Sequence, residues 1–95
     1  MNCQKIVFTQ HAFTRMFARE LTTETVKEAI RSGEVIASYP DDQPYPSFLL
    51  LHKKGRLVLH VVIGIDMSAD ICFVVTAYRP DPDLWSKDFK TRRKP

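Results

Sequence analysis

The stretch TTETVKEAIRSGEVIASY, residues 22–39, decides the fold, because its apolar spacing changes from helical to extended at Gly33. Before this glycine, apolar residues recur at the spacing of one helix face: Val26, Ala29 and Ile30. Thr22 precedes them and has the hydroxyl of a typical N-cap. The pattern predicts a helix over residues 23–32 that ends in a left-handed cap at Gly33.

A shorter amphipathic segment lies upstream and predicts a first helix over residues 10–20, capped by Thr9. Its apolar residues recur at helical spacing: Ala12, Phe13, Met16 and Phe17. His11, Arg15 and Arg19 follow one another at intervals of four and share a polar stripe. His11 and Arg15 can bind a phosphate of RNA or help to orient a catalytic group, or they can have an ordinary surface or packing role.

Downstream of Gly33 the sequence takes the pattern of strands and predicts four of them: 34–40, 47–53, 56–64 and 70–79. Three prolines exclude residues 40–46 from a central strand. The link between the last two strands is too short for a parallel crossover, so these strands are expected to be antiparallel. The expected fold class is α+β, with two N-terminal helices packed on one face of a four-stranded, mainly antiparallel sheet.

The period of two along each strand assigns side chains to the two faces of this sheet. The core between the helices and the sheet is expected to contain eight residues: Phe13, Phe17, Val26, Ile30, Leu59, Val61, Phe73 and Val75. His52 precedes the tight hairpin turn at Lys53–Arg56. A two-residue turn would place His52 on the helix side of the sheet, and a three-residue turn would place it on the other side.

The chain of 95 residues fits a single domain, residues 1–95. Its net charge of +3 comes from a basic C-terminal tail, residues 86–95, which holds five basic residues and one acidic residue, so the rest carries −1. We expect Lys90, Arg92 and Arg93 to contact phosphates of RNA, and the tail to matter little for folding. The alternative is a solubilising, partly frayed tail.

The two cysteines, Cys3 and Cys72, are far apart in the sequence and form no CxxC pair. Neither a metal site nor a cofactor is expected. The N-terminal residues MNCQKIVF contain no secretory signal, and the longest apolar runs are too short to span a bilayer. We therefore expect a cytoplasmic protein with two reduced thiols, while a disulfide stays open as an alternative.

A polar cluster is predicted on the face of the sheet that points away from the helices. If Ile63 pairs with Ile71, then Tyr78 lies opposite Arg56, and His60 lies on the same face opposite Val74. Four side chains then gather there, with Arg79 just beyond the last strand: Arg56, His60, Thr76 and Tyr78. The cluster depends on this register, because a slip of one residue would scatter it.

An arginine, a histidine and a tyrosine in one place suit metal-independent cleavage of a phosphodiester. A general base takes the proton of a ribose 2′-OH, an acid protonates the departing 5′-oxygen, and a guanidinium stabilises the phosphorane. The catalytic candidates are Arg56, His60, Tyr78 and Arg79. Ordinary alternatives are a hydrogen-bonded structural His60, a Tyr78 that covers the sheet edge and an exposed Arg56 at the hairpin.

A series of short motifs covers most of the chain, roughly residues 6–92. The first half contains His11-Ala12 with Arg15, a second helix ending in Gly33, Tyr39-Pro40 and Pro46-Ser47. The second half contains Arg56-Leu57, His60-Val61-Val62, and Thr76-Ala77-Tyr78-Arg79-Pro80-Asp81 with Trp85. In this combination the chain resembles a small bacterial domain family of unknown function.

That family resembles, in its order of two helices followed by a sheet, the RelE- and ParE-like toxins of bacterial toxin–antitoxin pairs. The RelE branch cleaves RNA without metal, using basic residues and a tyrosine in places comparable to Arg56, Tyr78 and Arg79. The resemblance implies a metal-independent endoribonuclease toxin that binds RNA and is held inactive by a cognate antitoxin. The ParE branch inhibits DNA gyrase by protein contact, so the alternative is a non-catalytic module that binds a protein partner.

Two observations separate the alternatives. The four catalytic candidates converge in a concave, solvent-open site if the chain is an enzyme. Their dispersal, or a His60 that is buried and bonded to the backbone, favours the binding module. The nearly neutral folded part departs from the RelE pattern, because it lacks a dense lysine patch.

Overall fold

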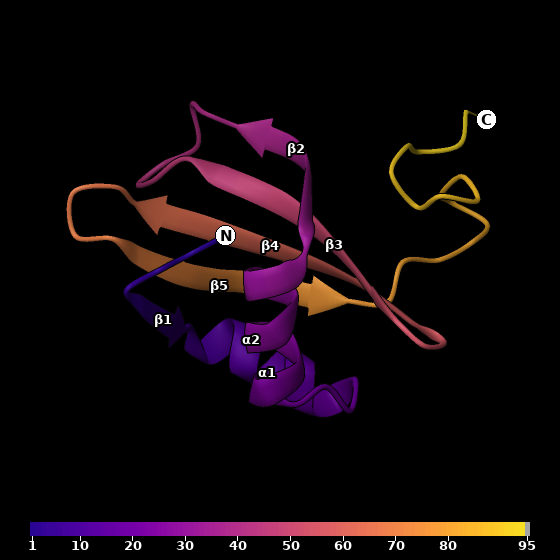
Figure 1. Cartoon of the computed structure of the whole chain (residues 1–95), viewed down its shortest axis with the longest axis horizontal. Coiled ribbons are helices and arrows are strands. Elements are labelled where there is room, and N and C mark those ends of the chain that lie inside the picture. The colour runs from indigo at the N-terminus through magenta and orange to yellow at the C-terminus, as the bar shows by residue number, and fades with distance from the viewer. Residues whose placement is uncertain (95) are drawn as a thin grey trace.

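The computed structural model describes residues 1–94 and contains two helices packed on one face of a mixed five-stranded sheet (Figure 1). The elements follow in the order β1 (Lys5–Phe8), α1 (Gln10–Ala18), α2 (Thr23–Ser32), β2 (Glu34–Tyr39), β3 (Ser47–Lys54), β4 (Leu57–Asp66) and β5 (Ile71–Tyr78). The strand order in the sheet is β1-β5-β4-β3-β2. The predicted α+β class is confirmed, whereas the predicted number of strands is wrong.

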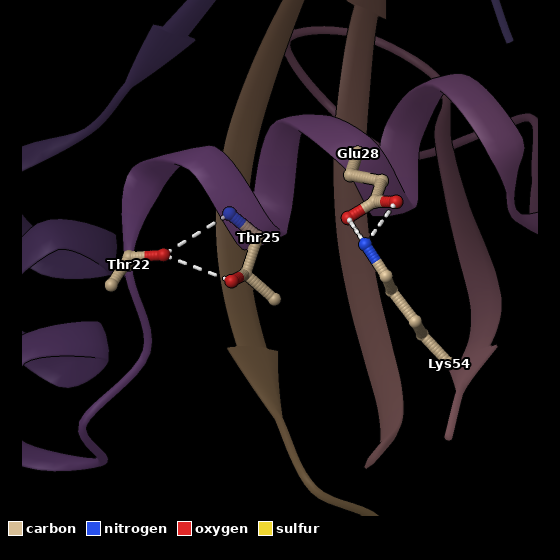
Figure 2. A network of polar contacts seen from close by, with 4 residues as sticks. All are labelled: Thr22, Thr25, Glu28 and Lys54. Carbon is tan, nitrogen blue, oxygen red and sulfur yellow. Dashed lines mark hydrogen bonds and ion pairs between the residues drawn. The ribbon is translucent and has the colours of Figure 1, made fainter. Parts of the chain in front are cut away.

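Both helices begin at their predicted caps. The Thr9 hydroxyl accepts a hydrogen bond from the Ala12 amide at 3.1 Å. Thr22 Oγ1 accepts one from the Thr25 amide at 3.1 Å and lies 2.9 Å from the Thr25 hydroxyl (Figure 2). In the same view, the Lys54 ammonium at the end of β3 lies 3.0 Å from one carboxylate oxygen of Glu28 on α2.

The residue that ends α2 packs closely against its neighbours and makes no left-handed turn. Gly33 has φ −76° and ψ 164°, so the predicted left-handed cap is wrong. A Cβ atom here would lie 2.3 Å from the Ala29 carbonyl oxygen and 3.0 Å from that of Leu51. Glycine is therefore needed so that the backbone can pass between the helix and β3 into β2.

The fifth strand is β1, which the sequence analysis missed. It lies parallel to β5 at one edge of the sheet, from Lys5 opposite Ile71 to Phe8 opposite Val74. Four residues are too few to establish an alternating pattern, and the partner strand lies far along the chain. The remaining pairs are antiparallel, including β4 with β5 as predicted.

The pairing of β1 with β5 also joins the two cysteines. Cys3 and Cys72 form a disulfide across a sequence separation of 69 residues, with their Cα atoms 5.8 Å apart. The expectation of two reduced thiols is wrong. The two cysteines are far apart in the sequence, and nothing in the spacing indicated that the N-terminal residues lie beside the last strand.

A β-bulge in β5 changes which side chains face the helices. The register of β4 against β5 shifts after Val62, and Val75 is left without a partner in β4. Val74 is consequently buried against the helices, while Phe73 lies on the opposite side of the sheet, here called the open face. The prediction that Phe73 and Val75 face the helices is wrong, and Val75 is 43% exposed.

The helix α1 buries one of its two apolar columns. Ala12 and Met16 pack in the core, whereas Phe13 and Phe17 are 52% and 82% exposed. The prediction that these two phenylalanines are buried is wrong, because helical spacing fits either column and only the docking angle selects one. The other predicted core residues are fully buried: Val26, Ile30, Leu59 and Val61.

Residues 80–94, here called the C-terminal segment, fold back onto the open face. The Ser86 amide donates to the Thr91 carbonyl and the Arg93 amide to the Leu84 carbonyl, both at 2.8 Å. Figure 1 shows this segment as a yellow coil that lies away from the helices. Its described part makes backbone hydrogen bonds within the segment and side-chain contacts with the sheet, so we expect it to contribute to stability more than the sequence suggested.

Candidate anion-binding site

The register of β4 against β5 differs from the one that the predicted cluster required. His60 pairs with Tyr78 and Val62 with Thr76, so these side chains share the open face. Arg56 was expected opposite Tyr78 but lies four residues from that position, about 13 Å along the strand at 3.3 Å per residue. The predicted pairing of Ile63 with Ile71 is wrong, and Arg56 is separated from the other catalytic candidates.

His60 is fully buried between the sheet and the C-terminal segment. Its Nε2 lies 2.8 Å from the Phe89 carbonyl oxygen and its Nδ1 lies 3.2 Å from the Tyr78 hydroxyl. Because a carbonyl can only accept, Nε2 carries the proton and Nδ1 accepts from Tyr78. Burial lowers the pKa of His60 below its ordinary value of 6.5, although the bond to Phe89 acts in the opposite direction.

Tyr78 contacts the buried His60 through its hydroxyl and also lies at the surface of the protein. Burial raises the pKa of this hydroxyl above its ordinary value of 10.0, with a further contribution from Tyr39, while Arg92 and Arg19 partly counteract it. The phenol therefore stays protonated at neutral pH and donates to His60. Tyr78 also lines a surface hollow.

This surface hollow, here called the arginine hollow, has a volume of about 470 Å³. Its charged and aromatic lining residues are Arg19, Tyr78, Arg79, Asp81, Trp85 and Arg92. Three arginines and a single carboxylate, that of Asp81, line the hollow, so its lining carries a net positive charge. Such a lining is suited to bind an anion with several oxygen acceptors, such as a phosphate.

Contacts with the backbone hold the arginines in place. Arg19 donates to the Ala77 carbonyl at 2.8 Å and to the Thr76 hydroxyl at 3.3 Å. Arg79 in turn donates to the Arg19 carbonyl at 2.7 Å. The Arg92 guanidinium lies 5.6 Å from the ring centre of Trp85. Each of the three has donors beyond these contacts, because a guanidinium carries five N–H groups.

The other predicted site residues lie elsewhere. Arg56 is exposed in the hairpin turn, and His11 and Arg15 are exposed on α1, outside the arginine hollow. Lys90 forms an ion pair with Glu34 on β2 at 3.0 Å. These residues are therefore not brought together in one site.

Arg93 has a structural role, because its Nε donates to the carbonyls of Pro82 and Trp85 at 3.0 and 2.7 Å. His52 is buried opposite Leu59 on the helix side, as expected for the two-residue turn between Lys54 and Leu57.

Two charged residues of the hollow, Arg19 and Asp81, were not site candidates from the sequence. Arg19 was visible as the last member of the polar stripe on α1, but nothing in the stripe indicated that it reaches β5. Asp81 lies three residues beyond the end of β5, where its carboxylate accepts from the Asp83 amide at 2.8 Å. Both are brought to Tyr78 by packing of α1 and of the C-terminal segment.

Neither a metal site nor a membrane span is found in the described part of the chain. Residues 1–94 contain no group of three or more histidine, cysteine, aspartate or glutamate side chains placed to hold a metal ion. No helix within them is long and apolar enough to cross a membrane.

Comparison with known proteins gives one family. No curated protein and no solved structure matches the chain. A family model matches residues 8–79, from the end of β1 to the first arginine after β5, and leaves the C-terminal segment outside. The expected resemblance to a domain family of unknown function is thereby confirmed, while no match links the chain to RelE- or ParE-like toxins. The chain belongs to the family described as Domain of unknown function (DUF4258).

Proposed function

We propose that this chain binds RNA and that the arginine hollow holds a phosphate of the RNA backbone. The proposal is carried by the convergence of Arg19, Arg79 and Arg92 in one hollow that Tyr78 also lines. These groups come from α1, the end of β5 and the C-terminal segment, so they form a site only in the folded chain. Guanidinium groups bind phosphate oxygens through paired hydrogen bonds, which a diffuse basic surface does not offer.

Two further features support binding over catalysis. His60 is buried and bonded to the Phe89 backbone, and Arg56 lies outside the hollow. These features were expected of a non-catalytic module, for which the sequence suggested a protein partner, whereas the arginines of the hollow favour RNA as the ligand. Because His60 is buried, a ligand in the hollow contacts Tyr78 and the arginines but not His60.

The test is the affinity for a single-stranded RNA as a function of salt concentration. Arg79→Gln and Arg92→Gln should each weaken binding by roughly 5- to 30-fold, as expected for losing one charge-assisted contact. Each should also lower the slope of log K against log salt by about 0.7. Arg56→Gln is the matched control, because it removes an exposed arginine outside the hollow.

Equal losses in all three variants would mean that binding depends on overall charge and would exclude the hollow as the site. An unchanged salt slope in Arg79→Gln and Arg92→Gln would do the same.

A second candidate function is metal-independent cleavage of the bound RNA, which the hydrogen bond between Tyr78 and His60 favours. In this reaction the ribose 2′-OH gives its proton to the Tyr78 oxygen while Tyr78 gives its own to His60 Nδ1. The 2′-oxygen then forms a bond to phosphorus and the bond to the 5′-oxygen breaks, with solvent protonating the leaving oxygen. The arginines stabilise the phosphorane, and Arg79 is the one among them that the sequence already indicated as a catalytic candidate.

This second candidate is the RelE-like one, and it includes a toxin activity and a cognate antitoxin as partner. If the chain cleaves a defined RNA in the presence of EDTA, Tyr78→Phe should lower the rate by about two to four orders of magnitude. Arg56→Gln should retain the wild-type rate. Binding without any cleavage by the wild type would reject the nuclease and leave the RNA-binding module.

A further inference from the structure

A second hollow lies at the other end of the open face. Its volume is about 440 Å³, within the range of pockets that hold small organic groups. Its apolar walls come from Pro44, Tyr45, Val62, Phe73 and Val75. The only carboxylate in its lining belongs to Asp42, and no basic side chain lines it. This surface is called the apolar hollow below.

The bulge in β5 creates this hollow. It directs Phe73 to the open face and leaves Val75 43% exposed. The Tyr45 ring stacks on Phe73, with ring centroids 5.3 Å apart and planes within 4° of parallel. Gly64 beside Phe73 has no side chain, so the floor stays open. The result is a flat aromatic wall next to an unfilled apolar space.

Both hollows lie on the open face of the sheet and are lined by residues of β5. β5 runs from Phe73 in the apolar hollow to Tyr78 in the arginine hollow, a span of roughly 16 Å at 3.3 Å per residue. Both residues point to the open face. One end of this surface is therefore apolar and aromatic with an acidic rim, and the other end is cationic.

We infer that the apolar hollow binds an unpaired nucleobase of the same RNA strand whose phosphate lies in the arginine hollow, so that the ligand is single-stranded RNA. The inference rests on the proposed function. A nucleic acid strand offers both chemistries at nucleotide intervals, an anionic phosphate and a flat base that stacks on aromatic rings. A duplex keeps its bases stacked inside and cannot place one in this hollow.

The charges of the two hollows indicate which part of the RNA binds in each. The Asp42 carboxylate at the apolar hollow repels a phosphate but can accept a hydrogen bond from the exocyclic amine of a neutral base. One of its oxygens already accepts from the Ser47 hydroxyl, which fixes the side chain at the rim. The arginines of the arginine hollow, by contrast, attract a phosphate.

The experiment measures the affinity of the full chain for three probes of equal length, about eight nucleotides. The probes are a single-stranded RNA, the same strand with abasic sites throughout, and an RNA duplex. Tyr45→Ala removes the aromatic wall. Val75→Glu places a charge in the apolar hollow at an exposed position, which keeps the test valid if Tyr45→Ala disturbs the neighbouring loop. Phe17→Ala removes an exposed ring from α1 and is the matched control.

We expect the wild type to bind the single strand more tightly than the abasic strand or the duplex. Tyr45→Ala should lose about 5- to 100-fold for the single strand, the range of one base-stacking contact, and nothing for the abasic strand. Val75→Glu should lose more for the single strand than for the abasic strand, because its added charge repels the phosphates of both but excludes a base only from the first. Phe17→Ala should match the wild type for every probe.

Equal wild-type affinity for the single strand and the abasic strand would overturn the inference and leave phosphate binding in the arginine hollow intact. A preference for the duplex would overturn it as well. Failure of the wild type to bind any probe, by contrast, would reject the proposed function itself.

Discussion

His60 is the residue whose chemistry depends most on its surroundings. Both ring nitrogens are engaged, one by the Phe89 carbonyl and one by the Tyr78 hydroxyl, and the ring meets the Trp85 ring edge-on at 4.5 Å. Protonation of Nδ1 would set two donors against each other, because the Tyr78 hydroxyl donates to that atom. The folded state therefore prefers the neutral ring, in agreement with its lowered pKa.

The first prediction concerns the pH dependence of stability. The unfolded chain protonates His60 near its ordinary pKa of 6.5, whereas the folded chain does so only at lower pH. Below about pH 6.5 the unfolded state binds more protons, so the free energy of unfolding should fall as pH drops from about 7 to 5. His60→Gln should show a smaller slope in urea denaturation over the same range.

The carboxyls of Glu28, Asp66 and Asp88 have pKa values below their ordinary values of 4.5, 3.8 and 3.8. Their protonation therefore lowers the free energy of unfolding mainly at pH values more acidic than the range in which His60 does so. Identical slopes for the wild type and His60→Gln would show that His60 is not held neutral.

At the scale of elements, the C-terminal segment completes the open face. It supplies the Phe89 carbonyl to His60 and the ring of Trp85, which is 8% exposed. Lys53 on β3 lies 5.9 Å from the Phe89 ring centre, and Lys90 pairs with Glu34 on β2. The segment therefore contacts both β2 and β3 as well as β4.

The second prediction is that removal of residues 87–95 destabilises the protein. The truncation deletes Phe89 and the partners of Ser86 and Leu84, and it uncovers His60. The free energy of unfolding should fall by roughly 1–3 kcal/mol, the scale of one buried aromatic contact and a few hydrogen bonds. Denaturation curves for the two chains measure it. Removal of Lys94 and Pro95 alone is the control and should have no effect on stability.

At the scale of the whole molecule, the disulfide links the beginning of the chain to the last strand. Cys72 is 1% exposed, and Cys3 packs against the same core beside Ile6 and Met1. Because β1 is a short edge strand, its attachment depends on few backbone hydrogen bonds. A crosslink across 69 residues restricts the unfolded chain strongly.

The third prediction is that Cys3→Ala lowers the free energy of unfolding of the oxidised protein by about 2–4 kcal/mol. Thermal denaturation with and without a thiol reductant measures the difference. The reductant should lower the melting temperature of the wild type towards that of Cys3→Ala and leave the variant unchanged. A wild type insensitive to a reductant that has reduced both thiols would contradict the prediction.

The sequence by itself determined the local structure. Thr9 and Thr22 begin the helices, and the residues from 23 to 32 form α2 with the predicted bounds. The hairpin between β3 and β4 and the antiparallel β5 also follow from short-range patterns. These features depend on backbone hydrogen bonds and turn geometry within a few residues, which the order of residue types is enough to specify.

Only the tertiary structure decided what depends on distant contacts. The parallel edge strand β1, the disulfide and the choice of Met16 over Phe17 each require a partner far along the chain. The candidate site belongs to the same class. Tyr78, Arg79 and Arg92 were noted from the sequence, but the bulge at Val75 sets the register of β5, and docking of α1 brings Arg19 beside Tyr78. A single residue more or less in one strand moves every later side chain to the other face, and spacing alone cannot show where that residue is inserted.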